Sequence, residues 1–306
     1  PKVEMTFTAV IEKDIDTKTL LVDSDNAGLK KVFWSPDDAI GVSNTKSFTW
    51  RDEWYGRWEE YSVSKFVASI DEPAASADFD GSAGFGDTFK AFYPYTETLR
   101  DSSGYFVFNL PMVQKYVAGS FDPNAAPMVA TAAYGETFEF KNLCGIVAFN
   151  LTGTSAVKSI MFSGTDGNGV PVPVSGLFDV NPASSDLAIR QHSTFGYVQT
   201  SVTVDCVEPV QLNESAPTTF YMMLPPATYA DFSLVITTAD GEIMMKSGKN
   251  LTITRSHLKP TGELEYVESE YIDLSGQGTA NSYIVKEAGL YSFKADVVGN
   301  GTYGYV

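Results

Sequence analysis

The sequence has little of what catalysis, metal binding and covalent cross-linking require. Its 306 residues include two cysteines, Cys144 and Cys206, and two histidines, His192 and His257. Two cysteines exclude a disulfide scaffold and a cysteine-rich zinc site, and they allow at most one bridge. The motifs HExxH and GxSxG, the P-loop and the dinucleotide fingerprint are also missing. We therefore expect a protein that is not an enzyme and that has no catalytic residues, no metal ligands and no cofactor.

Positive charge and long apolar runs are scarce as well. Lysine and arginine number 21 against 38 aspartate and glutamate residues, which gives a net charge of −17. A field of that sign repels phosphate backbones, so nucleic acid is excluded as a partner. No apolar run reaches the roughly 18 residues of a membrane-spanning helix. With 43% hydrophobic and 13% aromatic residues, the chain is nevertheless too apolar to be a disordered acidic polymer.

Alternating hydrophobicity is the dominant pattern. At the start of the chain Val3, Met5, Phe7, Ala9 and Ile11 share one face, which predicts a half-buried strand over residues 3–11. Similar runs occur at 88–93, 105–110, 145–151, 198–206, 219–224, 232–238 and 291–298, between clusters of Gly, Pro, Asn, Asp and Ser. Helical periodicity is rare. The expected fold class is all-β, built as sandwiches or barrels.

Two segments echo each other and suggest a tandem arrangement. TFKAFYP at 88–94 and TFYMMLPP at 219–226 are both strands that end at proline. We predict two related β-sandwich domains, residues 1–135 and 136–268. Residues 269–306 are too few for a stable core of their own, so we expect either a partial β module or a strand that is donated to another chain.

The alternating pattern predicts the surroundings of one of the two cysteines. Cys206 is in phase with Val202 and Val204, so it should face a core and behave as a small hydrophobic residue. A bridge between Cys144 and Cys206 stays an open alternative.

An aromatic segment at 48–61, FTWRDEWYGRWEEY, offers a candidate binding surface. Exposed Trp54, Tyr55 and Trp58 would stack on sugar rings or anchor a protein partner. The alternative is structural: Trp50 and Tyr61 lie in a core at the ends of a hairpin, and only its tip is exposed.

The chain resembles the fimbrillin family, the pilus subunits and related surface adhesins of Bacteroidales. The resemblance rests on the order of segments across residues 3–267 and not on a catalytic signature. The segments are MTFTAVIEKDIDTKT, VFWSPDDAIGV, FKAFYP, LPMVQKYVAGSFDPNAAPMVA, FEFKNLCGIVAFNLTG, SGLFDV, YMMLPPATY and LTITRSHLKPTGELEY.

This resemblance implies a fold, a location and a way of assembly. It implies two tandem transthyretin-like Greek-key β-sandwich domains, export as a lipoprotein whose lipid anchor holds it at the outer membrane, and display on the cell surface or in a fimbrium. Family members exchange strands, because a protease removes the first strand and a strand of a neighbouring pilus subunit replaces it. The departing strand here would be 3–11. Family cleavage follows an arginine, but no arginine precedes Arg51 and Lys18 holds the corresponding place, so an arginine-specific enzyme would not cut there.

The sequence also offers a strand to donate. Tyr291, Phe293, Ala295 and Val297 share one face and would fill alternate pockets of a vacated groove. They serve equally well as an ordinary strand of a partial domain. We expect a non-enzymatic pilus subunit or adhesin, with other subunits and a host or bacterial surface protein or glycan as partners. The alternative is a carbohydrate-binding surface protein that uses the 48–61 segment.

Overall fold

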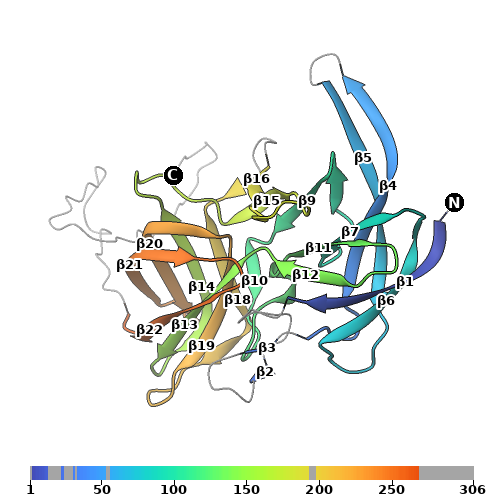
Figure 1. Ribbon diagram of the computed structural model, residues 1–306. Helices are drawn as coiled ribbons and strands as arrows, with labels where there is room; N and C mark the ends of the chain where they lie inside the picture. Colours follow the sequence, from blue (N-terminus) through green and yellow to red (C-terminus); the bar gives the residue numbers. More distant parts are fainter. Residues whose placement is uncertain are drawn as a thin grey trace, which may run out of the picture.

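The computed structural model describes residues 2–12, 22–23, 30–31, 33–52, 56–192 and 198–268, and for residues 45–61 it gives the backbone of the strands only. Several predicted residues therefore lie outside the described part: Lys18, Trp54, Tyr55, Tyr291, Phe293, Ala295, Val297 and the side chain of Trp58. Within it the protein is nearly all β, as the alternation predicted (Figure 1). The helical element of the described part is a single turn of 3-10 helix, η1 (Pro123–Ala125).

The N-terminal half forms a closed ring of paired strands. The pairing runs β5–β4–β7–β11–β12–β1–β6, and β6 pairs back onto β5. These strands are β1 (Lys2–Ile11), β4 (Ala39–Asp52), β5 (Gly56–Ala68), β6 (Ser76–Gly84), β7 (Thr88–Tyr93), β11 (Met128–Ala133) and β12 (Phe138–Asn142). The ring surrounds a core rich in aromatic side chains, among them Phe7, Trp34, Phe66, Phe79 and Phe138. Because each strand alternates, every second side chain enters this core.

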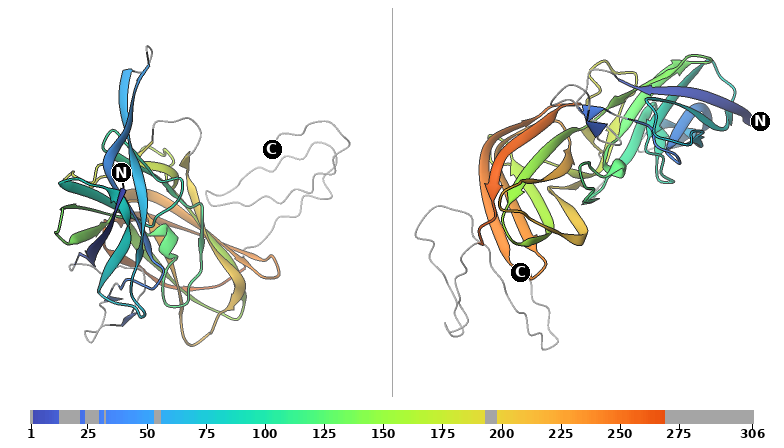
Figure 2. Two further views of the ribbon diagram at one scale, coloured as in Figure 1. Left: turned by 90° about the vertical axis from the view of Figure 1, so that its right-hand side faces the viewer. Right: turned by 90° about the horizontal axis from the view of Figure 1, so that it is seen from below.

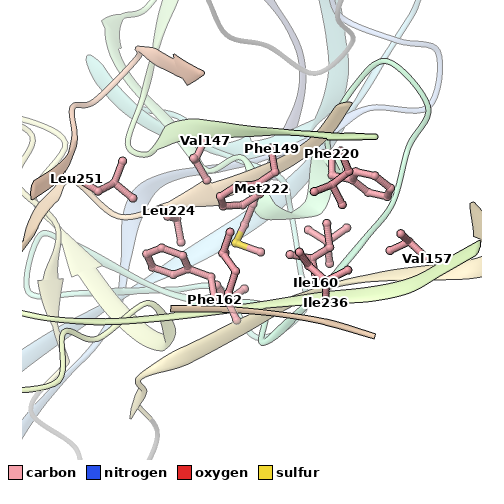
Figure 3. Close-up of a cluster of buried hydrophobic side chains, with 14 of the residues drawn as sticks. Val147, Phe149, Val157, Ile160, Phe162, Phe220, Met222, Leu224, Ile236 and Leu251 are labelled. Carbon is pink, nitrogen blue, oxygen red and sulfur yellow. The ribbon is translucent and has the colours of Figure 1, made fainter. Parts of the chain in front are cut away.

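The C-terminal half forms a sandwich of two sheets. One sheet contains β10 (Val113–Lys115), β14 (Ala156–Thr165), β18 (Ser201–Gln211), β20 (Ala227–Thr238) and β21 (Ile243–Ile253), and the other contains β13 (Gly145–Thr152), β19 (Thr218–Leu224) and β22 (Leu258–Glu265). Figure 3 shows Phe149, Phe220 and Met222 facing Phe162 and Ile236 across the interior. The turn between β20 and β21 contains an Asp-Gly pair with Gly241 at a φ of 86°, the backbone conformation that a tight hairpin turn requires.

Each half of the chain contributes a strand to a sheet of the other half, and buried side chains of both halves form a third core. The large sheet continues from β5 through β8 (Arg100–Ser102) and β9 (Tyr105–Leu110) to β15 (Ser175–Val180), with β16 (Arg190–Gln191) and β17 (Val198–Gln199) at its end. Conversely, β10 comes from the N-terminal half and pairs with β18 in the C-terminal sandwich. Buried side chains from both halves, such as Phe92, Phe108, Ile146 and Met223, pack together between them. The two lobes lie side by side along the molecule (Figure 2).

The predicted boundary between residues 135 and 136 stays a prediction. Strand pairing continues across it, because β11 pairs with β12 and both belong to the N-terminal ring. A short separate hairpin is formed by β2 (Val22–Asp23) and β3 (Lys30–Lys31).

Both cysteines are free and buried, so the bridge that the sequence left open is not formed. Cys206 belongs to the core of the sandwich, as predicted, whereas Cys144 belongs to the core between the halves. Burial raises the pKa of the Cys206 thiol to about 11 and raises that of Cys144 further. Both side chains therefore behave as small hydrophobic groups.

Gln114 connects the two sheets of the sandwich, and its loss tests that connection. Its side-chain amide donates to the Met223 carbonyl at 2.8 Å and accepts from the Met223 N–H at 2.9 Å, in a buried site. Gln114→Ala leaves both backbone groups unpaired, so we expect a loss of about 2–4 kcal/mol in the free energy of unfolding, measured in urea. Val113→Ala, at an exposed neighbour on the same strand, should change it by less than about 0.5 kcal/mol. Equal stability of the two variants would contradict this role.

Candidate functional site

The first strand closes the ring. β1 pairs antiparallel with β6 from Lys2 opposite Gly84 to Val10 opposite Ser76, and it pairs parallel with β12 at Ala9, Val10 and Ile11 (Figure 1). Without β1 the ring would open between β6 and β12. Two rows of backbone N–H and C=O groups would then lack partners, and such an edge is a template for another strand. We call the space that β1 occupies the β1 site.

The inner face of β1 fills this site with four side chains. Met5, Phe7, Ala9 and Ile11 are buried, whereas Val3 on the same face is 48% exposed. The alternating pattern predicted that Val3 shares the buried face, but its side chain is largely exposed at the end of the strand. β12 begins at Phe138, opposite Ala9, so the end of β1 that carries Val3 pairs with β6 alone.

Phe7 is the main anchor of β1 in the core. Its ring lies 4.9 Å from that of Phe89, 5.0 Å from that of Phe138 and 5.3 Å from that of Phe66, measured between centroids. These tilted contacts join β1 to three other strands of the ring. Aromatic pairs at this distance add about 0.5–1.5 kcal/mol each beyond the burial of area.

Trp34 fixes the backbone of β1 from inside the ring. Its indole Nε1 donates to the Ala9 carbonyl at 3.0 Å, and its side chain is fully buried. The Trp34 ring packs edge-on against Phe79 at 5.0 Å and Phe140 at 5.3 Å. Because a bulkier side chain at position 9 would meet this packed interior, the site demands a small residue there.

The outer face of β1 makes a second, polar set of contacts. The Thr6 hydroxyl donates to Asp80 and the Thr8 hydroxyl donates to Asp78, each at 2.6 Å. Both aspartates come from β6, directly opposite the threonines. An occupant of the β1 site therefore meets an acidic outer rim, which favours hydroxyl or cationic side chains at these two positions.

Glu12 ends the site with a charged cluster. Its Oε1 accepts hydrogen bonds from Arg255 Nη1 at 2.6 Å, from the Ser256 hydroxyl at 2.8 Å and from the Asn142 N–H at 2.8 Å. Arg255 also donates to the Asn142 carbonyl at 2.9 Å. We call these four residues the Glu12 cluster. It joins the end of β1 to the loop between β21 and β22 of the C-terminal sandwich.

The Glu12 cluster was not predicted from the sequence. Glu12 and Arg255 are 243 positions apart, and no local pattern connects them. The available signal was an acidic residue directly after the last buried position of an alternating strand. Arg255 meets Glu12 only because the fold brings the loop between β21 and β22 beside the end of β12.

A surface cleft of about 270 Å³ lies elsewhere on the ring, lined by Asp38, Lys65, Tyr93, Tyr95 and Asn124 among others. The Tyr93 hydroxyl donates to Asp38 at 3.0 Å, and Asp38 accepts the Ser35 N–H at 2.7 Å. Burial raises the pKa of Asp38, and burial together with the nearby charge of Asp38 raises the pKa of Tyr93 well above its usual value. These bonds close the turn before β4, so they have a structural role.

The aromatic hairpin consists of β4 and β5. Trp58 lies in β5, directly opposite Trp50 in β4, and the β4–β5 hairpin projects from the body of the protein (Figure 1).

Among the described residues, no three or more His, Cys, Asp or Glu side chains gather in a way that could hold a metal ion. In the same part of the chain, no helix has the length and apolar character to cross a membrane.

Comparisons with known proteins give distant structural neighbours. No family model matches the chain, and no curated protein is a significant match. A candidate cell adhesion protein from Bacteroides uniformis ATCC 8492 shares 16% identity at a TM-score of 0.39, covering 70% of this chain and 78% of its own. A candidate cell adhesion protein from Bacteroides fragilis NCTC 9343 shares 9% identity at a TM-score of 0.40, covering 87% and 95%.

A fimbrial assembly protein from Parabacteroides distasonis ATCC 8503 shares 9% identity at a TM-score of 0.25, covering 80% of this chain and 99% of its own. At TM-scores of 0.40 and below, the similarity is too distant to transfer the role of any residue.

Two truncations on one face of β1 test which part of it holds the site together. Phe7→Ala should lower the free energy of unfolding by about 3–5 kcal/mol, because it leaves a cavity among three aromatic rings. Val3→Ala should cost less than about 1 kcal/mol, because Val3 is half exposed. Urea unfolding of both variants measures the difference, and equal losses would show that β1 is not anchored as described.

Proposed function

We propose that the chain is a non-enzymatic cell-surface adhesin or pilus subunit that assembles when a strand of another chain replaces β1. The observation that carries the proposal is the place of β1 in the ring. A single strand closes the ring, and it fills an apolar site with alternate side chains. That is the arrangement that strand addition requires, since backbone hydrogen bonds supply affinity and alternate pockets supply specificity.

The free energy gained when a strand fills the β1 site is large enough for assembly. Burial of an apolar side chain contributes about 1.5–3 kcal/mol, so the four buried residues of β1 supply about 6–12 kcal/mol before ordering costs. An emptied site would expose this apolar surface and two strand edges. A second chain that fills it recovers both contributions.

The C-terminal segment of the chain has a sequence that suits this site. Aligned with β1, residues 291–297 place an apolar residue at each buried position and Ala295 at the position that demands a small one. The aligned pairs are Met5 with Tyr291, Phe7 with Phe293, Ala9 with Ala295 and Ile11 with Val297. On the outer face Ser292 and Lys294 would meet Asp80 and Asp78, the kinds of side chain that an acidic rim favours. This match supports a donor role for residues 291–297.

The location follows from the same proposal. We place the protein on the cell surface, held at the outer membrane by a lipid anchor or built into a fimbrium, as the fimbrillin resemblance implies. Its partners are other subunits that donate or receive a strand. Removal of the first strand would require cleavage near Lys18, by an enzyme that accepts lysine.

Deleting residues 1–18 tests strand replacement. The shortened chain has an open β1 site and keeps the candidate donor 291–297, so we expect a ladder of discrete oligomers on a native gel and in size-exclusion chromatography. An excess of a synthetic peptide with the sequence of residues 1–18 should return the ladder to monomer. A monomeric product that does not bind the peptide would contradict the proposal. A ladder that persists with the peptide would point to unspecific aggregation.

A second candidate function is carbohydrate binding at the tip of the β4–β5 hairpin. It is favoured by the projection of this hairpin from the body, together with its content of tryptophan and tyrosine (Figure 1). Aromatic rings presented on a projecting hairpin are accessible to a glycan and can stack on its sugar faces.

Fluorescence titration tests this second function. If Trp54, Tyr55 and Trp58 bind sugar, a polysaccharide should quench tryptophan fluorescence of the intact chain, and Trp54→Ala with Trp58→Ala should abolish the response. The matched control is a Trp34→Phe variant. It removes a fully buried indole and should retain the quenching response. No response across a broad glycan panel would exclude this function.

A further inference from the structure

We infer that Arg255, Ser256 and the backbone N–H of Asn142 form a carboxylate receptor at the end of the β1 site. The receptor selects occupants that carry Asp or Glu directly after their last buried apolar residue. This inference rests on the proposed function, because it concerns the strand that replaces β1. It adds the chemistry by which that strand is recognised.

The geometry is that of a binding site for one carboxylate oxygen. Three donors from two separate segments converge on Oε1 of Glu12 at 2.6–2.8 Å, and one of them is a guanidinium. The Glu12 side chain is 18% exposed and that of Arg255 31% exposed. Charge-assisted bonds in a partly buried place are stronger than neutral ones, and salt screens them less than exposed pairs.

The donors are held by residues that would remain after β1 leaves. Arg255 is positioned by the Asn142 carbonyl and the Ser256 hydroxyl, and the Ser256 N–H donates to the Cys144 carbonyl at 2.9 Å. The loop also packs tightly on Gly145, where an added Cβ would lie 2.3 Å from the Thr254 carbonyl oxygen. The emptied receptor would therefore keep its shape and one uncompensated positive charge.

A strand with a neutral side chain at the Glu12 position would leave hydrogen-bonding groups at this end of the site poorly satisfied. The Asn142 side chain is 1% exposed, and within the described residues its Nδ2 and Oδ1 have no hydrogen-bond partner. An occupant with an apolar side chain here would add the Asn142 N–H and one Arg255 bond to these unpaired groups, and one with an amide oxygen could accept these bonds but would not neutralise Arg255. Buried donors without acceptors are costly, and the cost is higher next to a charge.

The receptor also reads the register of the strand. The carboxylate position directly follows Ile11, the last buried residue of β1. A slip of one residue would turn every apolar side chain to the outer face, and a slip of two would move the acid about 7 Å along the strand. The preferred partner is therefore a strand with four alternating apolar residues, a small one at the third position, followed at once by an acid.

The chain's own C-terminal segment meets only part of this demand. In the register that places Ala295 at the Ala9 position, Val298 meets the receptor. Moving the segment by two residues brings Asp296 to the receptor but puts Phe293 where Ala9 is fully buried against Trp34. Residues 291–298 therefore satisfy either the core or the receptor. A strand of a different chain that carries the acid is the better occupant.

The experiment combines peptide competition with a readout inside the intact chain. Labelled peptides compete with β1 for the full-length Phe7→Ala chain, whose own strand is weakened. The four peptides have the sequences of residues 2–13, the same with Glu12→Gln, residues 288–299, and the same with Val298→Glu. Anisotropy and native mass spectrometry measure binding. We expect Glu12→Gln to weaken binding about 10- to 100-fold, the range for a bond to a charged group, and Val298→Glu to strengthen it about 10-fold or more.

The same comparison is repeated in the full-length chain with Phe7→Ala and Arg255→Met, where both differences should disappear. Hydrogen exchange of the β1 amides in the intact chain, without peptide, compares Glu12→Gln, Arg255→Met and the double variant. Faster opening in each single variant, with no further increase in the double, supports the receptor. Glu4→Gln on the exposed face of the same strand is the control and should leave exchange unchanged.

The outcomes separate the two proposals. If all peptides bind equally well, the carboxylate receptor is wrong and strand replacement stands. If no peptide binds, strand replacement is wrong, and hydrogen exchange alone decides whether Glu12 holds β1. Exchange rates in Glu12→Gln equal to those in the unmodified chain would overturn the receptor in either case.

Discussion

The insertion of β1 between β6 and β12 is the contact on which the N-terminal half depends. Seven strands form a closed ring, and β1 connects two edges that the other strands leave apart. Its inner face contributes Phe7 to a cluster of aromatic rings, and its Ala9 carbonyl accepts a hydrogen bond from the indole N–H of Trp34. The same strand therefore completes both the hydrogen bonding and the packing of this half.

The two faces and the end of β1 have separate physical roles. The apolar face supplies non-directional affinity, which many strands could provide. The outer threonines face carboxylates of β6, and Glu12 meets Arg255 of the C-terminal half. Polar contacts depend on position and charge, so under the proposed strand replacement they would distinguish between strands that fit the core equally well. The Glu12 cluster also makes β1 part of the contact between the two halves, beside their shared core.

Prediction from sequence succeeded where alternation was strong and local. The strands predicted at 88–93 and 105–110 agree with β7 and β9. It missed β11, whose small residues in MVATAA give a weak apolar signal although the strand is central to the ring. The burial of Val3 was wrong because exposure at a strand end depends on how far the neighbouring strand extends. Glu12 was missed because its partner lies in a distant loop.

The sequence by itself determined the all-β class, the scarcity of helix, the inner face of β1 and the buried, unreactive character of Cys206. Each follows from the types and spacing of nearby residues, because side chains alternate along a strand. Only the tertiary structure decided that β6 closes the ring on β5, that β9 and β15 join the two halves, and that Arg255 meets Glu12. These are contacts between residues far apart in the chain, and their partners are fixed by the packing of whole sheets.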